Sequence, residues 1–181
     1  MTDLRFTSFR DVKLRAAKES DREWLYQLFI ASHDDLSIAV AAWDEQQKDV
    51  FLQIQFQAQQ NHYRGIYPES RCDVILMHDE VIGQILVANI GDELRLVDVS
   101  LLPEFRNRGI GSALLRDLLE EAAGENKRVT LHVLQGNPAV CLYQRLGFSH
   151  VGEQGIYRRM EWVPACGTST RNKAQLPTSV S

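Results

Sequence analysis

The sequence predicts an α/β fold built on one mixed sheet, with a long antiparallel part. Strand and helix patterns alternate along the chain, which is typical of α/β domains. Three strand candidates in the middle follow one another directly and are separated only by the short turns HDE and GD. The length of 181 residues, with 44% hydrophobic and 24% charged residues, is that of a single globular domain.

The first half of the chain is predicted to hold one strand and two helices. Residues 12–16 form a short strand candidate, and Ser20 or Asp21 caps the helix that follows, with acidic residues in its first turn. A second helix is predicted over about residues 39–60, where apolar residues recur at spacings of three, four and seven. One apolar face is expected from Trp43, Val50, Phe51, Ile54 and Ala58.

The second half continues the alternation. Strands are predicted over residues 73–77, 81–90 and 93–101, followed by a helix over 109–123 that Gly124 ends. A strand over 128–134, a short helix over 138–146, and a hairpin over 148–153 and 156–162 complete the pattern. The predicted order is therefore β α α β β β α β α β β.

The composition changes near the end of the chain. Residues 1–164 are predicted to form the domain, and the polar run 165–181 to form a flexible tail. The first nineteen residues are rich in charge, so no secretory signal is expected, and no apolar stretch is long enough to span a bilayer. The three cysteines are widely spaced, which favours reduced thiols and a cytoplasmic location.

The charge balance and the histidines exclude other classes. Lys and Arg total 20 against 24 Asp and Glu, a net charge of −4, which argues against non-specific binding to nucleic acid or an anionic membrane. The five histidines are scattered without ligand spacing, and no CxxC pair occurs. No metal site is therefore predicted.

The segment VDVSLLPEFRNRGIGS, residues 97–112, predicts an anion site. Gly109 and Gly111 open a helix after a strand and a short basic loop, so a ligand can approach the backbone and the free N–H groups of the first turn. Arg106 and Arg108 add positive charge, and Ser112 adds a hydroxyl. A phosphate or pyrophosphate is the ligand that these groups favour.

Three other interpretations of this segment compete with an anion site. A dinucleotide fingerprint needs GxGxxG, but Leu114 stands at the third glycine position. A phosphate loop of the GxxxxGK[ST] type is absent. A glycine-loosened helix start with solvated arginines is the purely structural alternative.

Two blocks resemble the GNAT superfamily of acetyl-CoA-dependent N-acetyltransferases. Arg106-x-x-Gly109-x-Gly111, preceded by Leu101-Leu102-Pro103, is similar to the family's pyrophosphate loop, [QR]-x-x-G-x-[GA]. The second block, NPAVCLYQRLGF at residues 137–148, resembles the family's element with a tyrosine and a closing GF. The resemblance extends over about residues 13–162 and implies the GNAT fold and acetyl-CoA as co-substrate.

The resemblance also implies roles for particular residues. The backbone N–H of Leu101 would hold the thioester carbonyl at a developing oxyanion, with Leu102 beside it. Asn137 would bind the amide arm of the cofactor, and Tyr143 would protonate the leaving thiolate as general acid. The pyrophosphate would be wrapped by Arg106, Arg108, Gly109, Ile110, Gly111 and Ser112.

Asp98 is the candidate general base, because an amine acceptor is almost wholly protonated at neutral pH. Strand alternation opposes this role: if Val97 and Val99 face the cleft, Asp98 faces away unless the strand bulges. Glu104 and bulk water are rival bases, and a purely structural Asp98 held by a neighbouring donor is a further alternative.

For other residues the sequence predicts less specific places. His132 is expected to be packed or at the solvent edge, and Cys141 to be a small core residue. Aromatic residues of the segment before the three consecutive strands are expected to pack in the core or to line an acceptor pocket: Trp43, Tyr63 and Tyr67.

These inferences predict an N-acetyltransferase that moves an acetyl group to a primary amine by direct attack in a ternary complex. A small-molecule amine is favoured as acceptor, and a peptide or protein amine stays open. The alternative is a non-catalytic acyl-CoA-binding sensor or assembly module. Neither nucleic acid nor membrane is an expected partner, and the family resemblance leaves a homodimer open.

Overall fold

The structure is a computed structural model that describes residues 4–9 and 11–165, so the predicted tail lies outside the described residues from position 166 onward. Its sheet has eight strands in the order β1-β2-β3-β4-β5-β6-β8-β7. The strands are β1 (Leu4–Phe6), β2 (Val12–Ala16), β3 (Arg71–Met77), β4 (Glu80–Ile90), β5 (Glu93–Leu101), β6 (Arg128–Leu134), β7 (Ser149–Gln154) and β8 (Tyr157–Trp162). The helices are α1 (Arg22–Ser32), α2 (Asp34–Ala39), α3 (Glu45–Ile66), α4 (Ile110–Gly124) and α5 (Ala139–Arg145), with 3₁₀ turns at Glu19–Asp21 and Pro103–Phe105.

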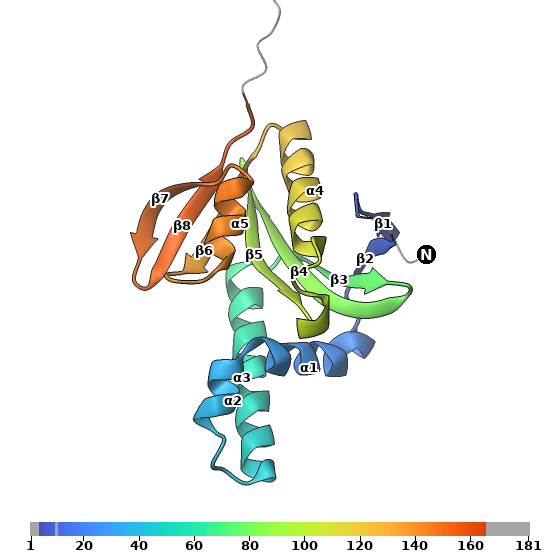
Figure 1. Ribbon diagram of the computed structural model, residues 1–181, viewed down its shortest axis with the longest axis vertical. Coiled ribbons are helices and arrows are strands. Elements are labelled where there is room, and N and C mark those ends of the chain that lie inside the picture. Colours follow the sequence, from blue (N-terminus) through green and yellow to red (C-terminus); the bar gives the residue numbers. More distant parts are fainter. Residues whose placement is uncertain (1–3, 10, 166–181) are drawn as a thin grey trace, which may run out of the picture.

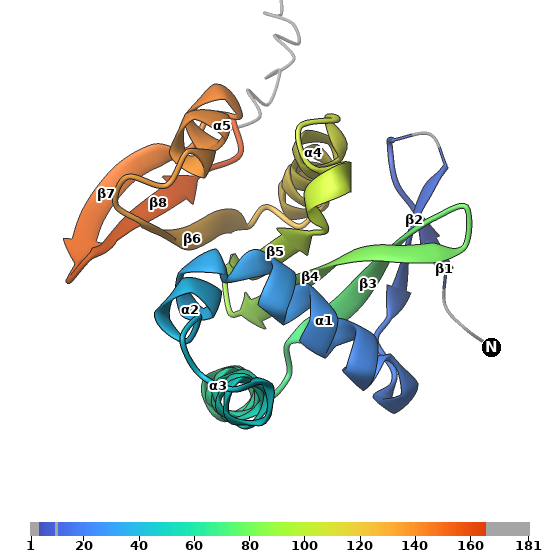
Figure 2. The same ribbon diagram turned by 60° about the horizontal axis from the view of Figure 1, so that its bottom comes forward.

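Helices cover the sheet on both faces. α4 and α5 lie on one face, and α1, α2 and α3 lie on the other (Figures 1 and 2). The main core lies between the sheet and α4, where Ile75, Ile82 and Ile110 are fully buried. A second, smaller core of aromatic and aliphatic side chains joins α1 to α3: Tyr26, Phe29, Leu52 and Phe56.

The predicted α/β class and the predicted order of elements are confirmed. Every predicted strand and helix is present, and the structure adds β1 and the short α2. The second predicted helix begins later than expected, because Asp44 caps it by accepting a hydrogen bond from the Gln47 N–H at 2.8 Å. This capping places Trp43 in the loop before α3.

The apolar face predicted for the second helix was wrong. Val50 and Ile54 are 52% and 58% exposed, whereas Leu52 and Phe56 are buried against α1. Apolar residues occur on two sides of this helix, so spacing alone did not show which side meets its neighbour.

The sheet opens between β5 and β6. These parallel strands are paired from Glu93 and Arg128 to Leu96 and Leu131, and beyond that point β5 stays paired only with β4, and β6 only with β8. The register of β4 against β5 also shifts here, because Val87 pairs with Leu96 while Leu86 pairs with Asp98. Val97 is thus the extra residue of a β-bulge at the mouth of the opening.

Within the described ranges, no helix is long and apolar enough to cross a bilayer. Likewise, the described side chains contain no group of three or more potential metal ligands.

Candidate active site

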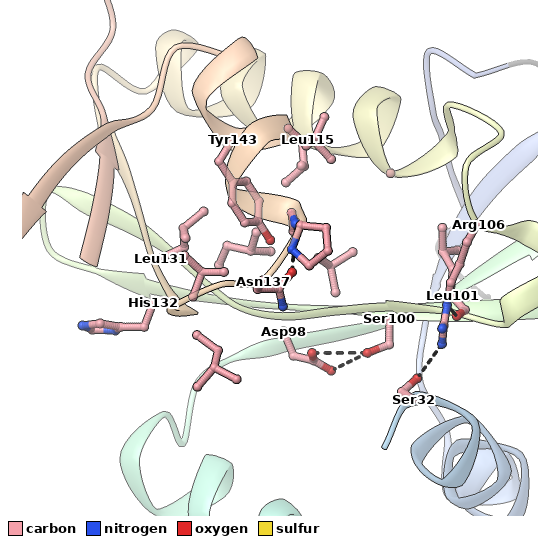
Figure 3. Close-up of a pocket in the computed structure, with 18 of the residues that line it drawn as sticks. Ser32, Asp98, Ser100, Leu101, Arg106, Leu115, Leu131, His132, Asn137 and Tyr143 are labelled. Atoms are coloured by element: carbon pink, nitrogen blue, oxygen red, sulfur yellow. Dashed lines mark hydrogen bonds between the residues drawn. The ribbon is translucent and has the colours of Figure 1, made fainter. Parts of the chain in front are cut away.

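A cavity of about 930 Å³ occupies the opening between β5 and β6. Its lining comes from the α4 loop and α5 on one side of the sheet and from α1, α3 and the start of β8 on the other. Figure 3 shows the two sides: Tyr143, Leu115 and Asn137 above β5, and Asp98 and Ser100 below it. The cavity therefore passes through the sheet and can receive two molecules from opposite faces.

The start of α4 forms the loop that was predicted to bind phosphate. Asn107 and Gly109 both have positive φ, 58° and 86°, which turns the chain sharply into the helix. A Cβ added at Gly111 would meet no atom within 4 Å, so the space in front of the first turn is open. Gly109, Gly111 and Ser112 line the cavity, while the Ile110 side chain is buried in the core.

The two arginines of this loop point to partners other than the helix start. Arg106 donates from Nε to the Leu101 carbonyl at 2.8 Å and from Nη2 to the Ala31 carbonyl at 3.0 Å. Figure 3 shows its side chain reaching down to Ser32. The Arg108 guanidinium lies over the Phe105 ring, 5.4 Å from its centre, and this residue is not part of the cavity lining. The loop backbone, more than these side chains, faces the open space.

At the end of β5, the backbone lies unusually close to β4. Leu101 pairs with Gly83, where any Cβ would collide with the Ser100 carbonyl and lie 2.7 Å from Leu101 Cδ2. The Leu102 N–H donates to the Ile82 carbonyl at 2.9 Å. Since successive N–H groups of a strand point to opposite edges, the Leu101 N–H points to the open edge between β5 and β6.

Asn137 and Tyr143 come from the segment that begins α5. The Asn137 Oδ1 accepts from the Ala139 N–H at 2.8 Å, which orients the side-chain amide at the helix start and leaves its nitrogen facing the cavity (Figure 3). The buried Tyr143 ring packs edge-on against Phe148, and its hydroxyl points into the cavity. Burial, with a smaller effect of the Asp98 charge, raises the pKa of Tyr143 to about 12, so the hydroxyl keeps its proton at neutral pH.

Asp98 lines the cavity on the face of α1 and α3, because the bulge at Val97 reverses the side-chain alternation of β5. Gln84 Nε2 donates to its carboxylate at 2.6 Å, and the Ser100 hydroxyl lies 3.3 Å from both carboxylate oxygens. Burial raises the pKa of Asp98 above its usual range despite these donors. The sequence left open whether a bulge turns Asp98 toward the cavity, and the structure contains this bulge.

Of the remaining candidate residues for the acceptor pocket and the base, one lines the cavity and the others do not. Tyr63 lines the cavity, whereas Trp43 packs against Phe51 outside it. Cys141, predicted as a core residue, is exposed on α5 because the buried side of that short helix is formed by Val140 and Tyr143. Tyr67 and the exposed Glu104 are not among the lining residues.

Sequence reasoning missed two residues of the acceptor side. His33 stacks on Phe29 at the end of α1, with its Nδ1 2.8 Å from the Phe29 carbonyl, and it lines the cavity. Tyr157 reaches the same cavity from the start of β8. No local motif marks either residue, since each enters the site only through the packing of elements that are distant in the sequence.

The fold and the opened sheet are those of the acetyltransferase class. The chain belongs to the acetyltransferase (GNAT) family, whose model matches residues 25–148. Solved structures agree in fold. The PaiA N-acetyltransferase of Thermoplasma acidophilum, solved with coenzyme A, is 17% identical with a TM-score of 0.65, covering 84% of this chain and 98% of that chain.

Two further structures have the same fold. The Vibrio cholerae spermidine N-acetyltransferase, in complex with CoA and spermine, is 20% identical with a TM-score of 0.59, covering 86% of this chain and 96% of that one. The ribosomal-protein-S18-alanine N-acetyltransferase of Escherichia coli is 17% identical with a TM-score of 0.59, covering 87% and 97%.

Curated relatives match over a short segment. The cysteine-rich protein 2-binding proteins of Mus musculus and Homo sapiens are each 46% identical over 46 residues, which is 25% of this chain. The chain therefore spans only 6% of the length of these relatives.

Proposed function

We propose that this protein transfers the acetyl group of acetyl-CoA to a primary amine by direct attack in a ternary complex. The observation that carries the proposal is the opening between β5 and β6, with the Tyr143 hydroxyl on one side of the sheet and the Asp98 carboxylate on the other. An acid and a base on opposite faces suit a reaction in which the leaving group and the nucleophile approach from opposite sides.

The proposed cofactor site is the wall formed by α4 and α5. Bound acetyl-CoA supplies the acetyl thioester. The backbone of residues 106–112 would hold its pyrophosphate at the positive end of α4, and the Asn137 amide would hold its extended arm. The open space at Gly111 fits this arrangement, because a phosphate can approach the N–H groups without meeting a side chain.

The proposed chemistry uses three groups in turn. Asp98 accepts a proton from the ammonium acceptor, directly or through water, and its raised pKa brings it closer to that of the amine. The Leu101 N–H donates to the acetyl oxygen as negative charge develops there. Tyr143 then gives its proton to the departing sulfur, and the attacking nitrogen loses its remaining extra proton, which restores the Tyr143 hydroxyl through water, so the products are an N-acetyl amine and CoA with its thiol.

The acceptor is proposed to be a small-molecule amine. Relatives of the same fold include one named for spermidine and one named for the alanine of a ribosomal protein, so both small and protein amines occur as acceptors among them. A cytoplasmic location is proposed on the basis of the cysteine pattern. A homodimer also stays a proposal.

Release of the CoA thiol from acetyl-CoA tests the proposal, measured against polyamines, amino acids, aminoglycosides and short peptides. The expected result is release with one class of acceptor and a loss of about 10²–10⁴ in turnover for Tyr143→Phe, with unchanged affinity for acetyl-CoA. Tyr157→Phe is the matched control, because this tyrosine lines the acceptor end of the cavity. If no acceptor releases thiol although acetyl-CoA binds, a non-catalytic binding module becomes the better interpretation.

A further inference from the structure

Two arginines and a histidine lie together at the outer end of the acceptor cavity. His132 is the first residue of β6 after the last pair with β5, and it lines the cavity. The Arg95 Nη1 lies 3.2 Å from the His132 Nδ1, and Arg159 is the cross-strand partner of His132 on β8. Because directly paired residues point to the same side of a sheet, Arg159 and His132 share a face. Figure 3 shows the His132 ring pointing outward, away from Asp98.

Arg159 is the member of this cluster whose charge is not balanced within the described structure. Arg95 is paired with Glu93 at 2.8 Å and donates to the Thr130 hydroxyl at 2.6 Å. Arg159 forms no ion pair with any described residue, and its buried Nε has no hydrogen-bond partner there. Its neighbour across β7 is Gly152, so no side chain covers it from that strand.

The charges that line the cavity differ between its centre and its outer end. Among the described lining residues, Asp98 is the one carboxylate, and it lies at the centre. The outer end holds His132, whose pKa is lowered by burial and by the nearby charges of Arg95 and Arg159. An acceptor with several positive charges would meet one carboxylate, that of Asp98, and then the positive charge of Arg159.

One face of the sheet beside the cluster is not covered by a helix of the described residues (Figure 2). Figure 2 shows that, within the described residues, no helix lies beneath β7 and β8 on the face of α1 and α3. Tyr157, on the same face as Arg159, lines the cavity at this edge. Arg159 is not itself among the lining residues, but it lies beside two that are: His132, its direct partner on β6, and Tyr157, two residues earlier on β8.

We propose that His132 and Arg159 form a subsite for an anionic group of the acceptor, so that the acceptor is an amine that also carries a carboxylate. This inference rests on the proposed acetyl transfer and adds the chemical class of the acceptor. The ammonium group binds at Asp98, and the carboxylate accepts charge-assisted hydrogen bonds from the Arg159 guanidinium. A dication has no favourable partner for its second charge and is therefore a poorer acceptor than the amino carboxylate.

The test uses acceptors that differ only in their distal group: hexylamine, ε-aminocaproate and hexamethylenediamine, with butylamine, γ-aminobutyrate and putrescine as a shorter set. In at least one set, the amino carboxylate is expected to show a kcat/KM about tenfold above that of the alkylamine, and the diamine no gain. Arg159→Gln brings the ratio between amino carboxylate and alkylamine close to one. Acetylation of the alkylamine itself reports on the proposed function independently of the subsite.

Arg158→Gln is the matched control, because Arg158 pairs with Val133 and points to the opposite face of the same strand. It is expected to keep the tenfold preference. Equal use of both acceptors in both sets, or a preference that survives Arg159→Gln, overturns the subsite. If Arg159→Gln does not fold, His132→Asn takes its place and is expected to reduce the same ratio.

A binding measurement keeps the subsite testable even if no amine is acetylated. The full chain is melted with CoA and either ε-aminocaproate or hexylamine, and only the amino carboxylate is expected to raise the melting temperature. Arg159→Gln is expected to lose this rise, and Arg158→Gln to keep it. No rise in the wild-type protein overturns the proposal.

Discussion

The two walls of the cavity are built in different ways. The wall of α4 presents mainly backbone: two residues with positive φ and a glycine with open space before it. The wall of α1, α3 and β8 presents side chains, including His33, Tyr63 and Tyr157. Backbone N–H groups recognise any phosphate of suitable geometry, whereas a set of side chains recognises one shape and charge.

The difference shows why one substrate can be shared across a family while the other changes. A backbone site depends on a short run of glycines and is preserved when surrounding side chains vary. A side-chain site is altered by single substitutions that leave the fold intact. Variants that act on one wall alone therefore test this division directly.

The largest expected effect comes from Gly111→Glu on the cofactor wall. The new carboxylate occupies open space and repels the pyrophosphate, so the Kd for CoA is expected to rise at least about 100-fold. Calorimetric titration measures the change, and the melting temperature without ligand is expected to stay within a few degrees. Gly65→Glu is the control, since Gly65 on α3 also has nothing within 4 Å. Unchanged CoA affinity would contradict a backbone-built phosphate site.

Asp98→Asn is expected to lower kcat/KM by about 100-fold at neutral pH through loss of the base. For the wild type, kcat/KM falls as the pH drops through the raised pKa of Asp98. A raised carboxyl pKa also means that the ionised group opposes folding above that pKa, so the variant is expected to melt at the same or a higher temperature at neutral pH. A pH–rate profile measures the fall of kcat/KM at low pH, and a thermal melt measures the change in the stability of the variant. Lower activity with lower stability would point to a structural role for Asp98.

Arg106→Gln sharpens the comparison, because Arg106 joins the two walls. Loss of its bonds to the Leu101 and Ala31 carbonyls is expected to raise the acceptor KM about tenfold, with little change in the Kd for CoA. Steady-state kinetics and CoA titration separate the two effects. Arg116→Gln, on the exposed side of α4, is the control. A loss confined to CoA affinity would mean that the guanidinium binds the pyrophosphate.

The smallest effect on catalysis is expected from Asp21→Asn, away from the cavity. Arg15 donates two hydrogen bonds to the buried Asp21, at 2.8 and 2.9 Å, and lowers the pKa of that carboxyl. A lowered carboxyl pKa stabilises the fold above pH ~4, and this contribution is lost as the pH falls further. The variant is expected to lose about 2 kcal/mol at neutral pH with unchanged kcat. Chemical denaturation measures the loss, and exposed Glu19→Gln should show none.

Much of the fold and of the cofactor wall was predictable from the sequence. The strands and helices follow from apolar periodicity and turn residues, and the glycines at 109 and 111 mark a helix start that needs open backbone. Tyr143 was found through the block that ends in Gly147-Phe148, and it does lie in the cavity. These features depend on residues that are close together in the sequence, so a short segment is enough to predict them.

The acceptor wall was not predictable to the same degree. The buried side of α3 depends on how α1 packs on it, and the Arg106 contact depends on where α1 ends. Asp98 faces the cavity because of a β-bulge, and no residue type in β5 predicts that bulge from the sequence. Each of these features depends on contacts or pairing between segments that are distant in the sequence. Apolar periodicity within one segment gives no information about such contacts.

The bulge at Val97 sets which side chains of β5 face the acceptor, because it takes up one residue while the residues before and after it keep their faces. Leu94 and Leu96 pack into the core before it, and Val99 and Leu101 pack against the same core after it. Straightening the strand with every residue retained would turn Asp98 into the apolar core and Val99 toward the acceptor, whereas deletion of Val97 would place Asp98 directly after Leu96 and still on the acceptor face. The acceptor face of β5 therefore depends on Val97 being absorbed in the bulge, and not on the number of residues in the strand.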